Sequence, residues 1–276
     1  MLCFRDGCVD RSGPDATAFA QAQFANDVVA LAPGYWQWSA WLTPKGRVIA
    51  LFALLKLEQD RILLLLPDAD ADGFVSQLQR FVFRRKLKIA MRDDLQASGA
   101  FQEPVSARNA RIGADGDSVE IDYGDGDAGR TLRIAPVREW PEHADSCARW
   151  KACDLLHGLP RLPAEQREQW TPQQLSLERL QAFSVKKGCY PGQEIVARTH
   201  FLGKAKRGLV LFEAGSPLTP GAEVSDGNRV IGSIVSTCDG ERHLALAVLP
   251  LEREAGALDV GGIALREIPL NDGLDR

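Results

Sequence analysis

The stretch Lys187-Gly188-Cys189-Tyr190-Pro191-Gly192-Gln193-Glu194 sets a cysteine among two glycines, a proline and polar side chains. Pro191 suits the first turn of a helix, and Ile195, Thr199 and Leu202 then recur on one helical face. We therefore expect Cys189 to lie near a helix N-terminus. The positive end of the helix dipole and the charges of Lys186 and Lys187 would favour its thiolate, which predicts a reactive thiol.

A buried structural cysteine beside a tight turn is the alternative interpretation of Cys189. A turn needs only one glycine, and an apolar core does not recruit two lysines, a glutamine and a glutamate. The surroundings therefore favour a functional thiol.

The same stretch carries a family resemblance, because Lys-Gly-Cys-Tyr-x-Gly-Gln-Glu is intact from Lys187 to Glu194. This pattern resembles the signature of the YgfZ family, relatives of the glycine-cleavage aminomethyltransferases (T-proteins). Other segments resemble the family pattern in the family's order: Gly13-Pro14-Asp15, Asn26-Asp27-Val28, Pro44-Lys45-Gly46-Arg47-Val48, Gly158-Leu159-Pro160 and Trp170-Thr171-Pro172-Gln173. The resemblance implies an α+β fold, with two aminomethyltransferase-like, folate-binding lobes over residues 1–203 and a small C-terminal β-barrel over residues 204–276.

The resemblance also implies a function. It indicates an accessory protein that binds tetrahydrofolate, with or without a polyglutamate tail, and supports iron-sulfur cluster assembly or repair in client enzymes, including enzymes that modify tRNA. The expected partners are folate and either client enzymes or cluster-assembly proteins. Because one thiolate cannot hold a cluster alone, Cys189 would need a partner or a small-molecule ligand. The alternatives are a folate-dependent one-carbon transferase and an interaction module with an incidental cysteine.

Two departures from the related patterns bear on these alternatives. Aminomethyltransferases carry a carboxylate on the strand after the hairpin turn, and that position falls here at Ala50 or Leu51. An aliphatic side chain cannot organise a developing ammonium or move a proton, so aminomethyl transfer by the usual route is not expected, and Asp27 is the conceivable stand-in. The second departure is Leu180-Gln181-Ala182, where the family commonly has Leu-Gly-Gly, and its larger side chains would narrow a folate cleft.

Several residues of the motif match the needs of a folate. A pterin site needs a carboxylate, an amide and an aromatic wall, which Glu194, Gln193 and Tyr190 could supply, although Glu194 could instead pair with Arg198 along a helix. An anionic polyglutamate tail could bind the densest basic cluster of the chain. That cluster could equally be a solvated rim or a docking face for an acidic partner, and it comprises Lys186, Lys187, Arg198, Lys204, Lys206 and Arg207.

Composition limits the other classes of function. The chain has 276 residues, 45% of them apolar, and a formal charge of only −4, which favours a multi-lobed globular protein without a phosphate-neutralising surface. Its six cysteines and four histidines show neither disulfide-framework nor metal-ligand spacing. The start of the chain lacks a secretory-signal pattern, and the longest purely aliphatic run, residues 62–66, cannot span a bilayer. We expect a cytoplasmic protein that binds neither membrane nor nucleic acid directly and has no resident metal.

Hydrophobic periodicity predicts the main elements. Alternation places Trp36 and Trp38 on the inner face of a sheet, so these tryptophans and Trp41 are interpreted as core rather than as a nucleic-acid stacking platform. We predict helices over residues 15–28, 71–87, 147–156 and a stretch after Pro191, strands over residues 35–42, 48–57 and 61–66, a strand-rich stretch over residues 88–134, and barrel strands over residues 209–212, 230–235 and 244–248.

Overall fold

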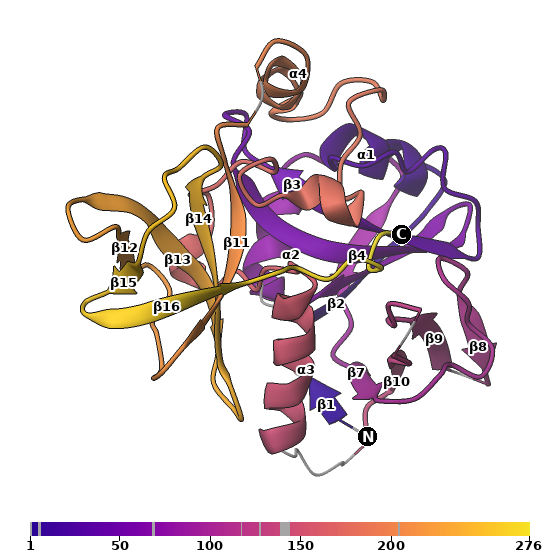
Figure 1. The fold of residues 1–276 in the computed structure, drawn as a ribbon. Helices are drawn as coiled ribbons and strands as arrows, with labels where there is room; N and C mark the ends of the chain where they lie inside the picture. The colour runs from indigo at the N-terminus through magenta and orange to yellow at the C-terminus, as the bar shows by residue number, and fades with distance from the viewer. Residues whose placement is uncertain are drawn as a thin grey trace.

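The computed structural model of the chain describes residues 2–4, 7–67, 70–116, 118–126, 128–138, 144–203 and 205–276. Two five-stranded antiparallel sheets and a closed barrel are joined by helices and loops (Figure 1). The α+β class with a terminal barrel, expected from the resemblance, is confirmed.

The first sheet is antiparallel and has the strand order β3-β4-β5-β2-β6. Helices α1 (Ala16–Gln23) and α2 (Ala71–Gln79) pack their apolar side chains on one face of it. Its strands are β2 (Gly7–Ser12), β3 (Tyr35–Leu42), β4 (Val48–Glu58), β5 (Arg61–Leu66) and β6 (Lys88–Met91).

The second sheet has the order β1-β7-β10-β9-β8, and α3 (Ala144–Leu156) contacts its β1 edge. Its strands are β1 (Leu2–Phe4), β7 (Leu95–Ala100), β8 (Gly113–Asp115), β9 (Ser118–Asp122) and β10 (Thr131–Pro136). The barrel follows with β11 (Arg207–Ala214), β12 (Glu223–Ser225), β13 (Val230–Cys238), β14 (His243–Pro250), β15 (Leu258–Val260) and β16 (Ile263–Ile268).

The position of strand β4 between two cores explains why its sequence is an almost continuous apolar run. Its alternate residues enter two different cores, so both faces are buried: Ala50 and Phe52 pack towards α1 and α2, whereas Leu51 and Leu55 face the centre of the molecule. The central core also receives side chains from the second sheet, α3 and the barrel, and therefore joins the lobes. Trp36 and Trp38 are each 1% exposed and Trp41 is 3% exposed, which confirms the prediction that these tryptophans are core residues.

Two predicted helices were too long. Helix α1 ends at Gln23, because Phe24 becomes extended and forms a β-bridge with Trp41 instead of continuing the helix. Helix α2 ends at Gln79, and Phe83 has a left-handed φ of 44°, which a helix cannot accommodate. No helix in the described ranges is long and apolar enough to cross a membrane.

Candidate functional site

The loop that carries the motif is fixed by backbone contact with the hairpin turn between β3 and β4. Gly192 has a φ of 81°, and a Cβ built on it would lie 2.6 Å from the carbonyl oxygen of Thr43 and 2.7 Å from the Cα of Gly46. Gly46 also has a left-handed φ, of 70°, and its own Cβ would lie 2.9 Å from the Cβ of Ile195. Two glycines about 150 residues apart thus allow two turns to touch.

Helix α4 (Gln193–Phe201) begins directly after Gly192 and projects at the top of the molecule (Figure 1). Val196 is the buried residue of this helix, and its carbonyl accepts a hydrogen bond of 2.9 Å from Nε2 of Gln173. Cys189 therefore lies four residues before the helix, on a loop whose two sides are tethered. The thiol-bearing residue is exposed.

Lys187 is buried, with 5% of its surface exposed, and its side chain points into the region that follows α1. Its Nζ donates to the carbonyl oxygens of Gln21 (2.6 Å), Phe24 (2.5 Å) and Asn26 (2.9 Å). An ammonium group has three donors, so all of its hydrogen bonds are used in joining the motif to the end of α1. Burial lowers the pKa of Lys187 to about 8, with the charge of Asp27 opposing that shift.

Tyr190 is buried beside Lys187, with its ring centroid 4.9 Å from the lysine Nζ. Its hydroxyl donates to the carbonyl oxygen of Ser184 at 3.3 Å, and burial raises its pKa to about 12. Tyr190 consequently contributes to the central core, and its ring supports the motif loop from within.

The remaining predicted site residues lie towards the surface. Gln193 donates from Nε2 to the carbonyl oxygen of Lys187 at 3.2 Å, which closes the motif loop on itself. Glu194 and Arg198 are exposed on α4, and no ion pair joins these two described residues. The residues of the predicted basic cluster do not form one group. Lys186, Arg198 and Lys206 are exposed, whereas Arg207 donates to the carbonyl oxygen of Ile231 in the barrel. Lys204 lies outside the described residues.

A cavity of about 340 Å³ opens beside the motif, between α4 and the turn η2 (Leu177–Leu180). None of the six predicted site residues lines it, although the neighbouring Lys186 does. Burial raises the pKa of Glu178, whose carboxyl group lies at this cavity. The lining residues are Asn26, Glu178, Gln181, Phe183, Ser184, Val185, Lys186 and His200.

Ser184 connects this cavity to the motif, and the sequence analysis missed it. Its Oγ accepts hydrogen bonds of 3.2 Å from the backbone N–H groups of Lys186 and Lys187, and its own N–H donates to the carbonyl of Ala25 at 2.9 Å. A serine two residues before a lysine pair is a possible turn signal, but its partners could be found only in the folded chain.

No protein-family model matches the chain, but individual proteins do. A Haemophilus influenzae protein of unassigned function is 30% identical over 207 residues, covering 74% of this chain and 70% of that protein. Proteins named tRNA-modifying protein YgfZ are 29% identical in Colwellia psychrerythraea (74% of this chain, 68% of the relative) and 26% identical in Vibrio vulnificus (90% and 83%). The chain belongs to the YgfZ family. A solved structure of glycine cleavage system aminomethyltransferase T from Bartonella henselae superposes with a TM-score of 0.65 at 16% identity, over 95% of this chain and 82% of that one, and shows the T-protein fold.

Gln181 is one of the two positions at which the sequence departs from the expected Leu-Gly-Gly pattern. Gln181 ends η2 with a left-handed φ of 53°, a conformation that favours glycine. Its carbonyl accepts a hydrogen bond of 2.6 Å from Nδ2 of Asn26, and its own Nε2 donates to Asp275 at 2.9 Å. These contacts hold the larger side chain at the edge of the cavity.

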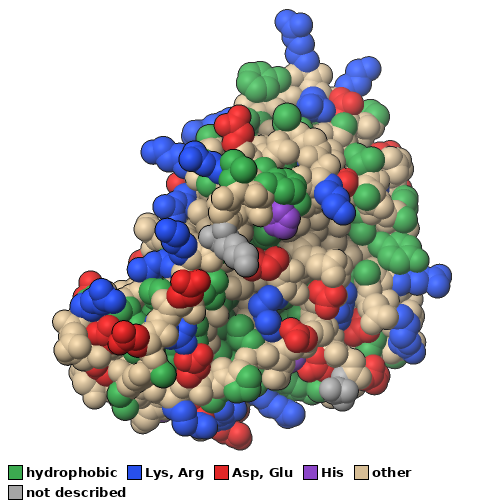
Figure 2. Space-filling view, turned by 45° about the horizontal axis from the view of Figure 1, so that its top comes forward, with side chains coloured by type: hydrophobic (Ala, Val, Ile, Leu, Met, Phe, Trp, Pro, Cys, Tyr) green, Lys and Arg blue, Asp and Glu red, His purple; other side chains and the backbone are tan. Residues whose placement is uncertain are grey.

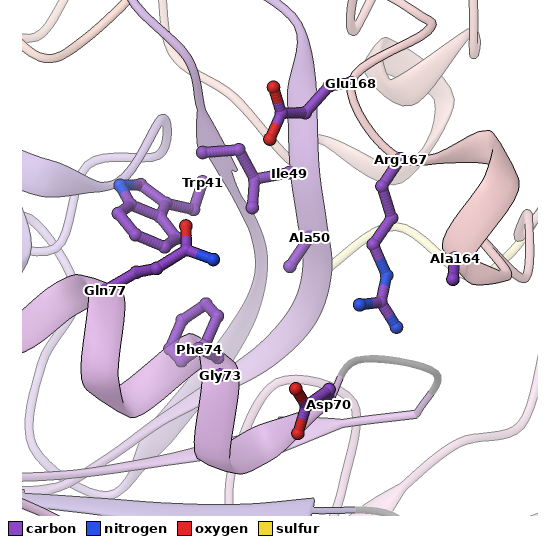
Figure 3. Close-up of a pocket in the computed structure, with 10 residues that line it drawn as sticks. All are labelled: Trp41, Ile49, Ala50, Asp70, Gly73, Phe74, Gln77, Ala164, Arg167 and Glu168. Atoms are coloured by element: carbon purple, nitrogen blue, oxygen red, sulfur yellow. The ribbon is translucent and has the colours of Figure 1, made fainter.

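The expected carboxylate position lies at a different cavity, of about 280 Å³, on the α2 side of β4 (Figure 3). Ala50 faces this cavity, whereas Leu51 faces the central core. Both side chains are aliphatic, so neither can act as the carboxylate of an aminomethyltransferase. Figure 3 shows that other chain segments bring charged side chains there: Asp70, Arg167 and Glu168. The sequence analysis did not identify Glu168, because only the fold brings the loop after residues 164–166 against Val48, whose carbonyl accepts the Glu168 N–H at 2.8 Å.

In the part of the chain that the structure describes, no group of three or more His, Cys, Asp or Glu residues is arranged to hold a metal ion. The stand-in considered for the missing carboxylate, Asp27, is engaged in its own loop. Its Oδ1 accepts hydrogen bonds from Nε2 of Gln21 and from the N–H of Ala30.

Proposed function

We propose that this YgfZ-family chain is a cytoplasmic accessory protein that binds tetrahydrofolate and supports assembly or repair of iron-sulfur clusters in client enzymes, including tRNA-modifying ones. The observation that supports it best is the pairing of an exposed cysteine on a tethered loop with a ligand-sized cavity lined by Lys186, next to that loop. Relatives named as tRNA-modifying proteins support the choice of clients.

The setting of Cys189 fits a thiol that acts on something outside the protein. Of the five cysteines whose side chains are described, Cys8 and Cys238 are buried, Cys147 and Cys153 are half-buried, and only Cys189 is exposed. The hydrogen bonds of Lys187 and the close contact of Gly192 with Gly46 hold its loop in one place. In this role the cluster is cargo, and the remaining ligands come from the client or the assembly protein.

The cavity residues fit the anionic, benzoylglutamate part of a folate. Lys186 and His200 offer cationic or donor groups to its carboxylates, and Phe183 offers an apolar wall. A volume of about 340 Å³ falls within the usual range for small-molecule sites.

The surface around α4 suits contact with a protein partner. Figure 2 brings this end of the molecule forward and shows Lys and Arg side chains bordering apolar surface. Phe201 and Leu202 are 66% and 84% exposed at the end of α4, close in sequence to the exposed Arg198 and Lys206. An apolar group with a basic border is the complement of a partner surface that carries carboxylates.

Calorimetric titration of tetrahydrofolate tests the folate part of the proposal. We expect saturable binding to the wild type, a loss of about fivefold with Lys186→Ala because a charged contact disappears, and no change with Lys151→Ala, which removes an exposed lysine from α3. Cys189→Ala should leave the affinity unchanged. Glu194→Ala tests the sequence prediction that the α4 carboxylate contacts the pterin. Absence of saturable binding to the wild type would contradict the folate role.

The thiol is tested in cells that contain only the Cys189→Ala variant. We expect reduced activity of iron-sulfur enzymes, including those that modify tRNA, at unchanged levels of the variant protein. Cys147→Ala is the matched control, since it removes a thiol from α3. Full activity of the client enzymes with Cys189→Ala would contradict a role for the thiol.

A further inference from the structure

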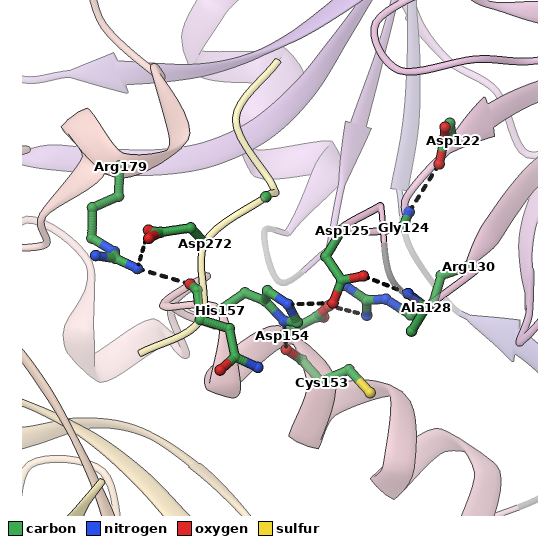
Figure 4. Close-up of polar contacts among 12 residues, drawn as sticks. Asp122, Gly124, Asp125, Ala128, Arg130, Cys153, Asp154, His157, Arg179 and Asp272 are labelled. Carbon is green, nitrogen blue, oxygen red and sulfur yellow. Dashed lines mark hydrogen bonds and ion pairs between the residues drawn. The ribbon is translucent and has the colours of Figure 1, made fainter. Parts of the chain in front are cut away.

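The segment of residues 269–276, here called the crossing segment, follows β16 and runs from the barrel to the middle of the molecule, where it meets Trp38 of β3 (Figure 1). The N–H of Asn271 donates to the carbonyl of Leu156 at 2.8 Å, at the end of α3. Asp272 forms an ion pair with Arg179 at 2.8 Å, on the other side of the segment (Figure 4). The crossing segment therefore touches both α3 and η2 before it reaches the sheets.

The crossing segment then enters the central core. Leu274 is 3% exposed, and its carbonyl oxygen accepts a hydrogen bond of 2.7 Å from Nε1 of Trp38. Gly273 has a φ of 99°, and a Cβ on it would lie 2.5 Å from the carbonyl oxygen of Asp125. A backbone without a side chain is needed at this point, because the segment passes directly against the loop after β9.

Arg276 lies over a tryptophan at the end of this path. Its guanidinium carbon is 5.5 Å from the ring centroid of Trp36. Its Nη2 donates to the carbonyl oxygens of Asp122 (3.3 Å) and Gly124 (2.5 Å), two residues that Figure 4 shows on the same loop. The surface under Arg276 thus offers an aromatic face and two acceptors to a flat group that carries N–H donors.

The fit of the arginine itself is incomplete. Its Nη1 donates to the carbonyl oxygens of Gly273 (3.0 Å) and Asp275 (2.8 Å) in its own segment. Its Nε, however, is buried and meets no acceptor within the described part of the chain, and no described carboxylate forms an ion pair with it. Burial lowers the pKa of Arg276, against the opposing charges of Asp122 and Asp275. A neutral planar donor group would satisfy the same two carbonyls without placing a charge there.

We propose that the Trp36 ring and the carbonyl oxygens of Asp122 and Gly124 form the subsite for the guanidine-like edge of a pterin, and that Arg276 occupies this subsite when no ligand is bound. The pyrimidine ring of a pterin contains a carbon bonded to three nitrogens, as guanidine does. It is flat, carries adjacent N–H donors and stacks on aromatic rings. The inference rests on the proposed binding of folate.

The position of the subsite agrees with the cavity beside the motif. Gln181 lines that cavity and donates to Asp275 of the crossing segment, and Asn26 lines it and donates to the carbonyl of Trp38 at 2.8 Å. The two sites are therefore neighbours. An elongated folate could place its ring on Trp36 and direct its carboxylates towards the cationic side of the cavity.

A glutamate-free probe, 6-methyltetrahydropterin, isolates the ring subsite. We expect Arg276→Ala to bind it about tenfold more tightly than the wild type by calorimetry, because the competing group has been removed. Arg276→Lys, which keeps the charge but loses the planar fork, should also bind more tightly. Arg229→Ala is the matched control, since the Arg229 side chain is 81% exposed on a barrel loop and should leave the affinity unchanged. Equal or weaker binding of this probe by Arg276→Ala would overturn the inference, since removal of a group that occupies the subsite must strengthen the binding of a ligand that competes for it.

Hydrogen exchange in wild-type protein with tetrahydrofolate gives an independent measurement. We expect faster exchange in peptides covering residues 270–276, because the ligand displaces this segment, and slower exchange around residues 34–38, because the ligand covers Trp36. A ligand that only stabilised the whole protein would slow exchange in both regions. If tetrahydrofolate binds but neither this exchange nor the affinity of Arg276→Ala changes, the inference fails and the proposed function stands. If Arg276→Ala binds the probe while the wild type does not bind tetrahydrofolate, the inference stands and the proposed function fails. If no variant binds either compound, both fail.

Discussion

Replacing Gly192 by alanine tests whether the contact between the motif loop and the β3–β4 turn fixes the functional loop. The new Cβ would lie 2.6 Å from the carbonyl oxygen of Thr43, 2.7 Å from the Cα of Gly46 and 2.9 Å from the Gly46 nitrogen. All three are backbone atoms, so no side-chain rotation can relieve the overlap. One of the two turns has to move.

The expected cost has two parts. An L-residue at the left-handed φ of Gly192 costs about 1 kcal/mol or slightly more. Pushing two well-packed turns apart costs roughly another 2 kcal/mol, as overpacking does in cores. We therefore expect Gly192→Ala to lower the free energy of unfolding by about 3 kcal/mol.

Urea denaturation of Gly192→Ala and Gly188→Ala provides the comparison. Gly188 belongs to the same loop and has no atom within 4 Å of the position of its Cβ, so its substitution should cost less than about 0.5 kcal/mol. The Gly192 variant should also alkylate faster at Cys189, because its loop is no longer clamped. Equal stability of the two variants would refute the role assigned to the contact.

Three further predictions concern individual side chains. Lys187→Met should lower the free energy of unfolding by roughly 3 kcal/mol in urea denaturation, because three buried carbonyls lose their donor, whereas the exposed neighbour in Lys186→Met should change it by less than about 0.5 kcal/mol. For Glu120, burial alone would raise the pKa, but hydrogen bonds from the backbone and hydroxyl of Ser106 and from other backbone N–H groups lower it from 4.5 to about 2. Its contribution of roughly 3 kcal/mol is present above pH 4.5 and disappears as the pH falls towards 2, so stability measured across that window should fall less steeply in Glu120→Gln than in wild type. Iodoacetamide should modify Cys189 before the other four described cysteines of the native protein, and mass mapping that finds a buried cysteine modified first would contradict its exposure.

The fold could be predicted where the sequence is periodic. The β3–β4 hairpin was recognisable from the alternation in residues 35–42 and the apolar run that follows, and the barrel strands from short apolar segments between turns. The helix ends could not be predicted, since tertiary contacts decide them. Phe24 does not continue α1 because it forms a β-bridge with Trp41. The stabilisation from that bridge depends on β3, which comes later in the chain and lies outside the helical pattern.

The sequence directs attention to the motif but does not give the contacts of its residues. It singles out Cys189, whose exposure only the structure shows, and the charge of Lys187 gave no sign that its ammonium would be used by three carbonyls more than 160 residues away. Gln181 lines the cavity next to the motif, yet only the structure shows that its backbone has a left-handed φ, a conformation that favours glycine. Arg276 was not identified at all, because Trp36 and Gly124, which it contacts, are distant in sequence. Ser184 was missed because its hydroxyl bonds look like those of an ordinary turn, and its link to Ala25 exists only in the folded chain.

The arrangement suggests how a ligand and the thiol can influence one another. Ser184 lines the cavity, and its Oγ also holds the backbone of Lys187, which is fixed to the end of α1 and lies two residues before the thiol. We therefore expect a ligand that orders the cavity wall to order the loop that presents Cys189 as well, without touching the sulfur. This coupling requires the loop to be anchored at both sides, by the Lys187 ammonium on one side and by the Gly192 turn on the other. The lysine and the glycine of the motif are thus explained by the position that they impose on the exposed cysteine between them.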